Sequence, residues 1–254
     1  MRFDERVVVV TGAGRGLGAA YARAFAARGA HVVVNDIDSE AAEELASTID
    51  GALSWACDAA DTESATELVR GAVDSFGRLD IVVANAGSSW PVPFALMSND
   101  DTLTALRANY LSAYEVVRAA WPHFVARKYG RVVTTASGAI FGFAARAHYA
   151  AAKGAVLALT NTLAIEGAAH GIQSNCVFPW ARTRLARPDS EAPEPESAAP
   201  AVLWLAHHEC MSNGAAFAVG GGQIQRISLT TGPRVALTEA TIDAARIAFQ
   251  RAVP

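Results

Sequence analysis

Short runs of β-branched residues alternate along the chain with alanine-rich segments of helical length, and this alternation limits the folds open to it. The runs are residues 7–10, 31–35, 54–57, 80–84, 131–135 and 173–178. The helical segments are residues 19–28, 40–49, 62–76, 100–127 and 149–170, with Pro122 kinking the fourth or ending it late. Strands that are apolar almost throughout must be covered on both faces. The pattern therefore predicts an α/β protein with a parallel sheet between two layers of helices.

A glycine-rich turn, residues 11–18 (Thr-Gly-Ala-Gly-Arg-Gly-Leu-Gly), joins the first predicted strand to the first predicted helix. Its glycines let the backbone turn tightly and approach a phosphate, which the N-terminus of the next helix attracts. Because the turn lies within a strand–turn–helix–strand unit, it predicts a dinucleotide site. The expected architecture is a Rossmann-type three-layer sandwich with a seven-stranded parallel sheet. The cofactor contacts expected from this turn are Gly12, Arg15, Gly16, Leu17 and Gly18.

Asp36 ends the second predicted strand and indicates which dinucleotide binds. A carboxylate at this position accepts hydrogen bonds from the adenosine ribose and repels a 2′-phosphate, so it favours NAD over NADP. Arg15 is the opposing feature, because a cation in the turn can help to hold a 2′-phosphate. We give Asp36 the greater weight and predict NAD.

Tyr149 and Lys153 lie four residues apart and so share one face of a predicted helix. A tyrosine pKa of about 10 is too high for a base at neutral pH, but a nearby ammonium group lowers it. The pair is therefore a candidate for proton transfer. Ser137, at the end of a predicted strand, is a candidate to hydrogen-bond a substrate oxygen. His148 is interpreted as a residue of the pocket or the helix start, without a catalytic role.

Composition excludes several function classes. The formal net charge is −4, whereas proteins that bind nucleic acid usually carry a basic patch. No apolar run approaches the roughly 18 residues of a membrane span. Three cysteines, Cys57, Cys176 and Cys210, are odd in number and far apart, which argues for a reducing compartment and against a disulfide framework or a metal site. We expect a cytoplasmic protein, without a signal peptide, that binds no metal.

These motifs together resemble the short-chain dehydrogenase/reductase family over nearly the whole chain. The features that carry the resemblance are residues 11–18, Asp58, residues 85–87 (Asn-Ala-Gly), Asn109, Ser137, Tyr149 and Lys153. On the cofactor side, the resemblance implies that Asp58, with Ala59 beside it, holds the adenine amino group. It also implies that Asn85, Ala86 and Gly87 brace the central sheet against the cofactor.

On the catalytic side, the resemblance implies four roles. Tyr149 is the acid/base, and Lys153 lowers its pKa and binds the nicotinamide ribose. Ser137 orients and polarises the substrate carbonyl or hydroxyl. Asn109 anchors a water molecule that links Lys153 to bulk solvent. Counting back from Tyr149 instead would put Ala136 at the serine position, but we prefer Ser137 because loops absorb deletions more easily than strands.

Within the family, the chain closely resembles the (3R)-3-hydroxyacyl-CoA dehydrogenase units of peroxisomal multifunctional enzymes, also called 17β-hydroxysteroid dehydrogenases. The segments that carry this likeness are residues 21–36, 118–121, 128–131, 163–167, 203–205 and 217–220. It implies NAD-dependent interconversion of a hydrophobic secondary alcohol and its ketone, with a 3-hydroxyacyl-CoA or a hydroxysteroid as substrate and a role in lipid metabolism. One alternative is a reductase of a 3-oxoacyl thioester or a small ketone. Another is a catalytically idle NAD-binding protein.

Aromatic residues are expected to line a hydrophobic substrate pocket beside the catalytic residues. The expected pocket residues are Trp90, Phe143, His148 and Trp180. Trp180 follows Pro179 where the family usually has glycine, so it would wall the pocket. Four arginines near the same mouth favour a polyanionic coenzyme A substrate, whereas acidic residues nearby argue against one. These arginines are Arg146, Arg182, Arg184 and Arg187.

Residues 183–200 differ in composition from the rest of the chain, being rich in proline and acidic residues. They predict a mobile loop, neither strand nor helix, that acts as a lid over the substrate. Thr238 is expected to cap a last helix that serves packing or oligomer contacts. The domain prediction is a single dinucleotide-binding dehydrogenase domain over residues 1–254, standing alone. The family resemblance further implies a homodimer or homotetramer.

Overall fold

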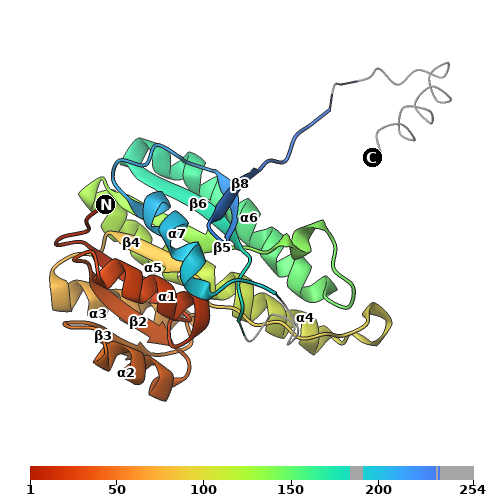
Figure 1. The fold of residues 1–254 in the computed structure, drawn as a ribbon, viewed down its shortest axis with the longest axis horizontal. Coiled ribbons are helices and arrows are strands. Elements are labelled where there is room, and N and C mark those ends of the chain that lie inside the picture. Colours follow the sequence, from red (N-terminus) through yellow and green to blue (C-terminus); the bar gives the residue numbers. More distant parts are fainter. Residues whose placement is uncertain (184–190, 233, 235–254) are drawn as a thin grey trace.

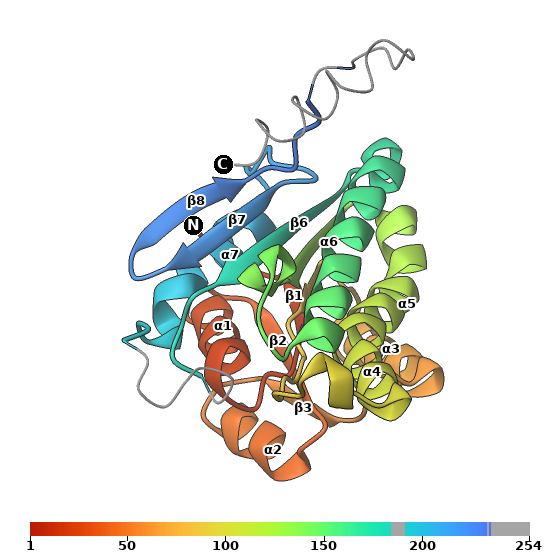
Figure 2. The same cartoon turned by 90° about the vertical axis from the view of Figure 1, so that its right-hand side faces the viewer.

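The computed structural model describes residues 1–183, 191–232 and 234, and in them one sheet runs through the molecule (Figures 1 and 2). Its order is β3-β2-β1-β4-β5-β6-β7-β8. The strands are β1 (Val7–Thr11), β2 (His31–Asp36), β3 (Leu53–Ala56), β4 (Ile81–Ala84), β5 (Gly130–Thr135), β6 (Ile172–Pro179), β7 (Ala216–Gly220) and β8 (Gln223–Ile227). The pairings from β3 to β7 are all parallel, which confirms the predicted seven-stranded parallel sheet, and β8 adds an antiparallel eighth strand.

Helices cover both faces of the sheet (Figure 2). The α-helices are α1 (Gly16–Ala26), α2 (Ser39–Ser47), α3 (Thr62–Phe76), α4 (Asn99–Leu106), α5 (Ser112–Arg127), α6 (Ala147–Gly167) and α7 (Ala199–Ala206). Helices α1, α2 and α7 lie on one face, and α3, α5 and α6 on the other. The arrangement is the predicted three-layer sandwich. Among the described residues, no helix is long and apolar enough to cross a membrane.

The valines of β1 show why this sequence needs two helical layers. All of them are completely buried. Val8 and Val10 pack against α1 and its neighbours, whereas Val7 and Val9 pack against α3 and α5. Because successive strand residues point to opposite faces, an all-valine strand buries both of its faces. Each fully buried valine contributes about 1.5–3 kcal/mol relative to an exposed one.

The order of the sheet reverses between β1 and β4, which lie side by side at its centre. Ligands of open α/β sheets bind beyond the carboxyl ends of the strands at such a point. At the opposite ends of the same two strands, Asp80 holds them in register. Its buried carboxylate accepts hydrogen bonds from the Val7 amide (3.0 Å), from Arg6 (3.0 Å) and from Arg78 (2.6 and 2.7 Å). Asp80 thus fixes β1 and β4 relative to each other at the ends opposite to those that carry the site.

The structure corrects three details of the sequence prediction. Strand β8 was missed because its side chains are largely exposed and polar, which leaves no hydrophobic run to detect. The predicted helix 100–127 is present, but a π-helical turn, η2 (Arg107–Leu111), separates α4 from α5, and Pro122 lies inside α5 without ending it. Residues 195–200 are helical and not irregular: η5 (Pro195–Ala198) leads directly into α7. Prolines at the first positions of a helix are tolerated, so a proline-rich segment need not be a loop.

Two predictions fall outside the described residues. The central part of the expected lid, residues 184–190, is among them. So is the last helix expected after Thr238. Three further short 3₁₀ turns lie within the described part of the chain: η1 (Phe94–Leu96), η3 (Gly138–Phe141) and η4 (Ala168–His170).

Candidate active site

The glycine-rich turn lies at the carboxyl end of β1, where β4 approaches it. Gly12 has a positive φ of 60°, and a Cβ there would lie 2.8 Å from Ala86 Cα. A Cβ at Gly18 would overlap the Gly12 carbonyl oxygen. The turn is therefore possible only with glycine at these two positions. Because neither glycine has a side chain, backbone atoms border the space beyond the end of β1. This is the cradle that a pyrophosphate requires.

Thr11 and Asn85 fasten the turn to β4. The Thr11 hydroxyl accepts hydrogen bonds from the amides of Asn85 and Ala86, both at 3.1 Å. The Asn85 side-chain amide donates to the carbonyl oxygens of Thr11 (3.1 Å) and Gly12 (3.2 Å). Asn85 and Ala86 thus brace the turn directly. The sequence did not predict that Thr11 would join the turn to β4, because no sequence pattern distinguishes such a threonine from others at strand ends.

Asp36 lies at the end of β2 with its carboxylate turned toward the glycine turn. Its Oδ2 accepts a hydrogen bond from the Gly14 amide (2.9 Å), and its Oδ1 accepts one from the Asp38 amide (3.1 Å). Arg15 does not point to Asp36 but forms an ion pair with Asp38 at 2.5 Å. This hydrogen-bonded pair raises the pKa of Arg15. The cation that could hold a 2′-phosphate is thus engaged by a neighbouring carboxylate.

Asp58 follows β3 along the same edge of the sheet. Its Oδ1 accepts a hydrogen bond from the Ala60 amide (2.9 Å). Its Oδ2 accepts two from Arg107, at 2.8 and 3.1 Å. Ala59 between them is buried. Arg107 was not among the residues singled out from the sequence, because nothing in the sequence pairs it with an acid 49 positions away.

Tyr149 and Ser137 meet at the carboxyl ends of the central strands. Ser137 follows β5 and begins η3, and Tyr149 lies in the first turn of α6. Burial raises the pKa of the Tyr149 phenol, while a hydrogen bond from Ser137 and the charge of Arg146 act in the lowering direction. The net direction is opposite to the one that the Tyr–Lys pair predicts, because removal from water outweighs the nearby dipole and charge. Ala136, the alternative to Ser137, is buried in the core beside β6.

Lys153 lies one turn further along α6 and is buried, with 3% of its surface exposed. Its Nζ donates to the Thr135 carbonyl oxygen at 2.8 Å and lies 5.8 Å from the centre of the Tyr149 ring. Burial lowers the pKa of Lys153 to about 8. The ammonium group is therefore held against the end of β5, near the Tyr149 ring. Thr135 takes part through its backbone, so no side-chain pattern could have revealed it.

Asn109 lies in the π-helical turn and is buried. Its side-chain amide donates to the carbonyl oxygens of Ser88 (2.8 Å) and Ala105 (3.0 Å). Its Oδ1 has no partner within the described part of the chain. A Cβ at Gly87 would lie 2.5 Å from this oxygen and 3.2 Å from Lys153 Nζ. Asn109 and Lys153 therefore face the same small space beside Gly87, and a buried acceptor turned into it calls for a polar partner such as water.

The expected pocket residues do not form one aromatic wall. Trp90 and His148 pack edge to face, with ring centres 4.8 Å apart, and the Trp90 indole donates to Asp101 (3.1 Å). Phe143 and Trp180 are more than half exposed. Among the described residues, no ring contact joins either of them to Trp90. The structure thus brings together two of the four.

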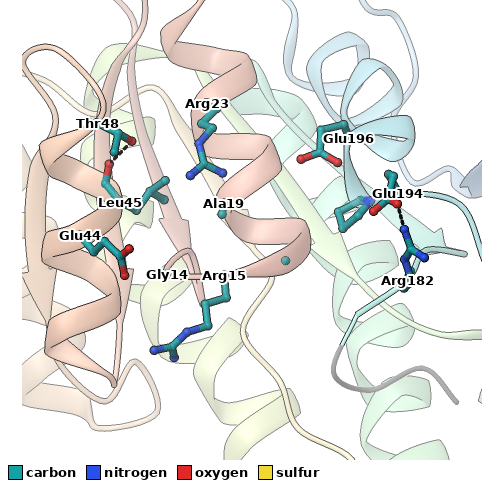
Figure 3. A pocket seen from close by; sticks show the side chains of 12 residues that line it. Gly14, Arg15, Ala19, Arg23, Glu44, Leu45, Thr48, Arg182, Glu194 and Glu196 are labelled. Atoms are coloured by element: carbon teal, nitrogen blue, oxygen red, sulfur yellow. Dashed lines mark hydrogen bonds and ion pairs between the residues drawn. The ribbon is translucent and has the colours of Figure 1, made fainter. Parts of the chain in front are cut away.

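A cavity of about 450 Å³ lies beside the N-terminal half of α1, where Gly14 and Arg15 of the glycine turn line it (Figure 3). Its charged lining residues come from the glycine turn, α1, α2, the segment after β6 and the segment before α7. Arg182 is engaged there by an ion pair with Glu194. None of the candidate catalytic residues lines this cavity, so it is not the space above Tyr149. Two other arginines expected at the mouth of the substrate pocket, Arg184 and Arg187, lie outside the described residues.

The doubly wound sheet, the glycine cradle and the tyrosine, lysine and serine at its carboxyl edge define an oxidoreductase that uses a nicotinamide dinucleotide. A family model for short chain dehydrogenases matches residues 6–192, which is more than half of the chain. The chain therefore belongs to the short-chain dehydrogenase family.

Individual relatives agree with this assignment. The chain is 42% identical to the peroxisomal multifunctional enzyme type 2 of Mus musculus over 89% of its own length, but it spans only 33% of that enzyme. It is 40% identical to a short-chain type dehydrogenase/reductase of Mycobacterium tuberculosis, covering 89% of this chain and 86% of the relative. A crystal structure of a short chain dehydrogenase from Mycobacterium avium superposes with a TM-score of 0.89 at 30% identity, covering 100% of this chain and 98% of that one.

Proposed function

We propose that this dehydrogenase uses NAD to interconvert a hydrophobic secondary alcohol and its ketone, with a 3-hydroxyacyl-CoA as the leading substrate and a hydroxysteroid as the second candidate. The observation that carries the proposal is the arrangement at the carboxyl edge of the sheet. Ser137 and Tyr149 meet there, and Lys153 lies buried behind the tyrosine. This set matches the requirements for removing a proton from an alcohol as hydride leaves its carbon.

Each residue has a part in that proton transfer. Ser137 donates a hydrogen bond to the substrate oxygen, and the Tyr149 phenolate accepts the hydroxyl proton during oxidation. Lys153, fixed by the Thr135 carbonyl, supplies positive charge near the phenol and a donor for a ribose hydroxyl. The unpartnered Asn109 oxygen holds a water molecule on the path from Lys153 to solvent. A bound oxidised nicotinamide would supply the hydride acceptor, and its positive charge, present before the transfer, would favour the phenolate.

The residues around the adenosine side support NAD as the dinucleotide. Asp36 presents a carboxylate at the end of β2, where a 2′-phosphate would meet a like charge. Arg15 is paired with Asp38, so the cation that could offset this repulsion is occupied. In this arrangement the turn from Gly12 to Gly18 receives the pyrophosphate, and Asp58 with Ala59 receives the adenine.

The substrate class rests on two lines of support. The mouse relative is a multifunctional peroxisomal enzyme, and this chain matches about a third of it. Exposed rings of Phe143 and Trp180 offer apolar surface for a long or bulky substrate. A reductase of a 3-oxoacyl thioester uses the same residues in the opposite direction and is the second candidate function. We further propose a cytoplasmic homodimer or homotetramer that is paired through the helices carrying Asn109 and Tyr149.

The test is the initial rate of NADH formation on a panel of 3-hydroxyacyl-CoAs, hydroxysteroids and simple secondary alcohols. Tyr149→Phe removes the proton acceptor while keeping the ring, and we expect it to lower kcat/KM about 10²- to 10⁴-fold. NAD binding, followed by protein fluorescence, should persist in the variant. Turnover that survives in Tyr149→Phe would contradict the assigned base. Tight NAD binding by the wild type without turnover of any panel member would favour a catalytically idle protein.

A further inference from the structure

Arg146 is a partly buried cation near the proposed base, and the proton-transfer scheme does not use it. It lies immediately before the first residue of α6, at positions i, i+3 and i+7 with Tyr149 and Lys153. Tyr149 and Lys153 share one face of α6, and Arg146 is the N-cap residue, with φ −136° and ψ 25°, that precedes this face. The Arg146 charge reaches both neighbouring titratable groups, since it acts to lower the pKa of Tyr149 and of His148. The guanidinium is therefore close enough to the phenol to act on it through its charge, from the start of the helix that carries Tyr149.

The backbone around Arg146 is fixed from two sides. Ala145, just before it, has a φ of 57°, a left-handed conformation that alanine rarely adopts. The Ala145 carbonyl oxygen accepts a hydrogen bond from the Val92 amide (2.9 Å), which ties the start of α6 to the loop after β4. The Arg146 amide donates to the Phe143 carbonyl oxygen (3.2 Å), and its own carbonyl accepts from Ala150 (2.8 Å). A strained position held by such bonds is typical of functional sites.

One donor atom of the Arg146 side chain is shielded from solvent and lacks a partner. Its Nη1 is shielded from solvent and has no hydrogen-bond acceptor within residues 1–183, 191–232 and 234. No carboxylate of the described residues forms an ion pair with it, whereas the arginines at positions 15, 107 and 182 each have one. A donor atom of a charged group that is shielded from water and has no acceptor is costly, and such an atom in a native protein needs an explanation. An acceptor brought by the substrate provides it.

We propose that Arg146 donates a hydrogen bond to an oxygen acceptor of the substrate, a carboxylate or a thioester carbonyl, whose carbon lies two bonds from the carbinol carbon. This inference rests on the proposed function, because it assumes that Tyr149 acts at the carbinol. It narrows the substrate to a 3-hydroxy acid or its thioester and gives a plain alcohol or a hydroxysteroid a clear disadvantage. An arginine suits either acceptor, since its planar donors match a carboxylate and also reach a carbonyl.

The experiment uses three alcohols with one carbon skeleton: 3-hydroxyhexanoyl-CoA, free 3-hydroxyhexanoate and 3-hexanol. Wild type is compared with Arg146→Gln and Arg146→Lys, and with Arg70→Gln as the charge-matched control on the exposed side of α3. For each protein, kcat and KM are measured across pH with NAD in excess. Thermal unfolding of every variant checks that the fold is intact.

We expect Arg146→Gln to lower kcat/KM at least tenfold on the compound whose oxygen Arg146 binds, mainly through KM, and less on 3-hexanol. Arg146→Lys should recover part of this loss, and Arg70→Gln should match wild type. Comparing the thioester with the free acid shows which acceptor Arg146 binds, because the fall in kcat/KM caused by Arg146→Gln should be larger for the compound that carries this acceptor.

Three outcomes would overturn the inference. An equal loss on all three alcohols, together with a shifted pH profile, would mean that Arg146 acts on Tyr149 and not on the substrate. Wild-type turnover of 3-hexanol as efficient as that of both other compounds would remove the need for an acceptor, while leaving the dehydrogenase assignment intact. Oxidation of none of the three by wild type, with turnover of a hydroxysteroid, would overturn the acyl substrate and this inference together.

Discussion

Lys153 Nζ donates a hydrogen bond to the carbonyl oxygen of Thr135 at 2.8 Å, so an ammonium group is anchored to the carboxyl end of a central strand while almost completely buried. A single backbone acceptor does not replace the hydration of a charged group. Burial accordingly lowers the pKa of Lys153 to about 8. The proposed active site thus contains a buried ammonium group whose charged form destabilises the fold, close to the Tyr149 phenol whose deprotonation it is proposed to favour.

This cost should be visible as a dependence of stability on pH. An unfolded lysine titrates near 10.4. Between pH 8 and about 10.4 the unfolded chain therefore binds more protons than the folded one, and stability rises with pH. Relative to Lys153→Met, wild type should gain free energy of unfolding on the order of 3 kcal/mol across this window. Chemical denaturation of both proteins from pH 7 to 10.5 measures the difference, and parallel curves would refute the depressed pKa.

Gly87 is predicted to be intolerant of any side chain. A Cβ there would lie 2.5 Å from Asn109 Oδ1 and 3.2 Å from Lys153 Nζ, in the space that these two groups share. We expect Gly87→Ala to displace one or both and to lower kcat/KM by about tenfold to a hundredfold. Gly154→Ala is the matched control, because a Cβ at that position of α6 meets open space.

The control should show the opposite effect on stability. Alanine in place of glycine inside a helix stabilises by roughly 0.5–1 kcal/mol, so Gly154→Ala should unfold at a slightly higher temperature with its kinetics near wild type. Steady-state kinetics and thermal unfolding of both variants make the comparison. Equal activity in the two variants would show that the space beside Gly87 is not part of the site.

Asp80 is predicted to be the main polar anchor of the two central strands. Its carboxylate is fully buried and receives hydrogen bonds from Arg6, Arg78 and the Val7 amide. Burial acts to raise its pKa, but the hydrogen bonds and the charge of Arg78 outweigh burial, so the pKa of Asp80 is lowered. Asp80→Ala would strand two cations, at a cost near the lower end of about 3–5 kcal/mol because both keep contact with water.

The sign of the pH dependence follows from the lowered pKa of Asp80. Its stabilisation is complete above the unfolded value of about 3.9 and is lost as pH falls through the folded value. Urea denaturation at pH 7 and at pH 3 should therefore show a smaller difference between wild type and Asp80→Ala at the lower pH. If the difference in free energy of unfolding between wild type and Asp80→Ala were the same at both pH values, the stabilisation would not come from the ionised carboxylate.

The sequence predicted the strands whose ends carry the candidate site, because those strands are marked by apolar runs. Once residues 7–10, 80–84 and 131–135 are recognised as neighbouring parallel strands, Gly12, Asn85 and Ser137 must meet at one edge. What the sequence could not show depends on backbone geometry or on distant pairing. The π-helical turn around Asn109 and the Thr135 carbonyl leave no side-chain pattern. The exposed strand β8 lacks the apolar run that marked the others.

The pairing of Arg15 with Asp38 was also hidden, and it leads to the last prediction. Arg15 is the cation of the glycine turn, and the Asp38 carboxylate holds it at 2.5 Å. Asp38 also caps α2, since its Oδ1 accepts a hydrogen bond from the Ala41 amide (3.1 Å). The substitution Asp38→Asn would keep the cap, because asparagine is as good a cap as aspartate, but it would remove the charge that holds Arg15.

We therefore expect Asp38→Asn to raise kcat/KM with NADP severalfold while kcat/KM with NAD changes little. Asp36→Asn removes the repulsive carboxylate itself and should have the larger effect on the ratio of the two cofactors. In the double variant Asp36→Asn/Asp38→Asn, a free Arg15 next to a neutral residue should bring NADP close to NAD, because a hydrogen-bonded arginine–phosphate contact is worth about tenfold or more in affinity. Steady-state kinetics with both dinucleotides on one substrate decide the matter. NADP use that is the same in all three variants and wild type would mean that neither acid sets the cofactor preference.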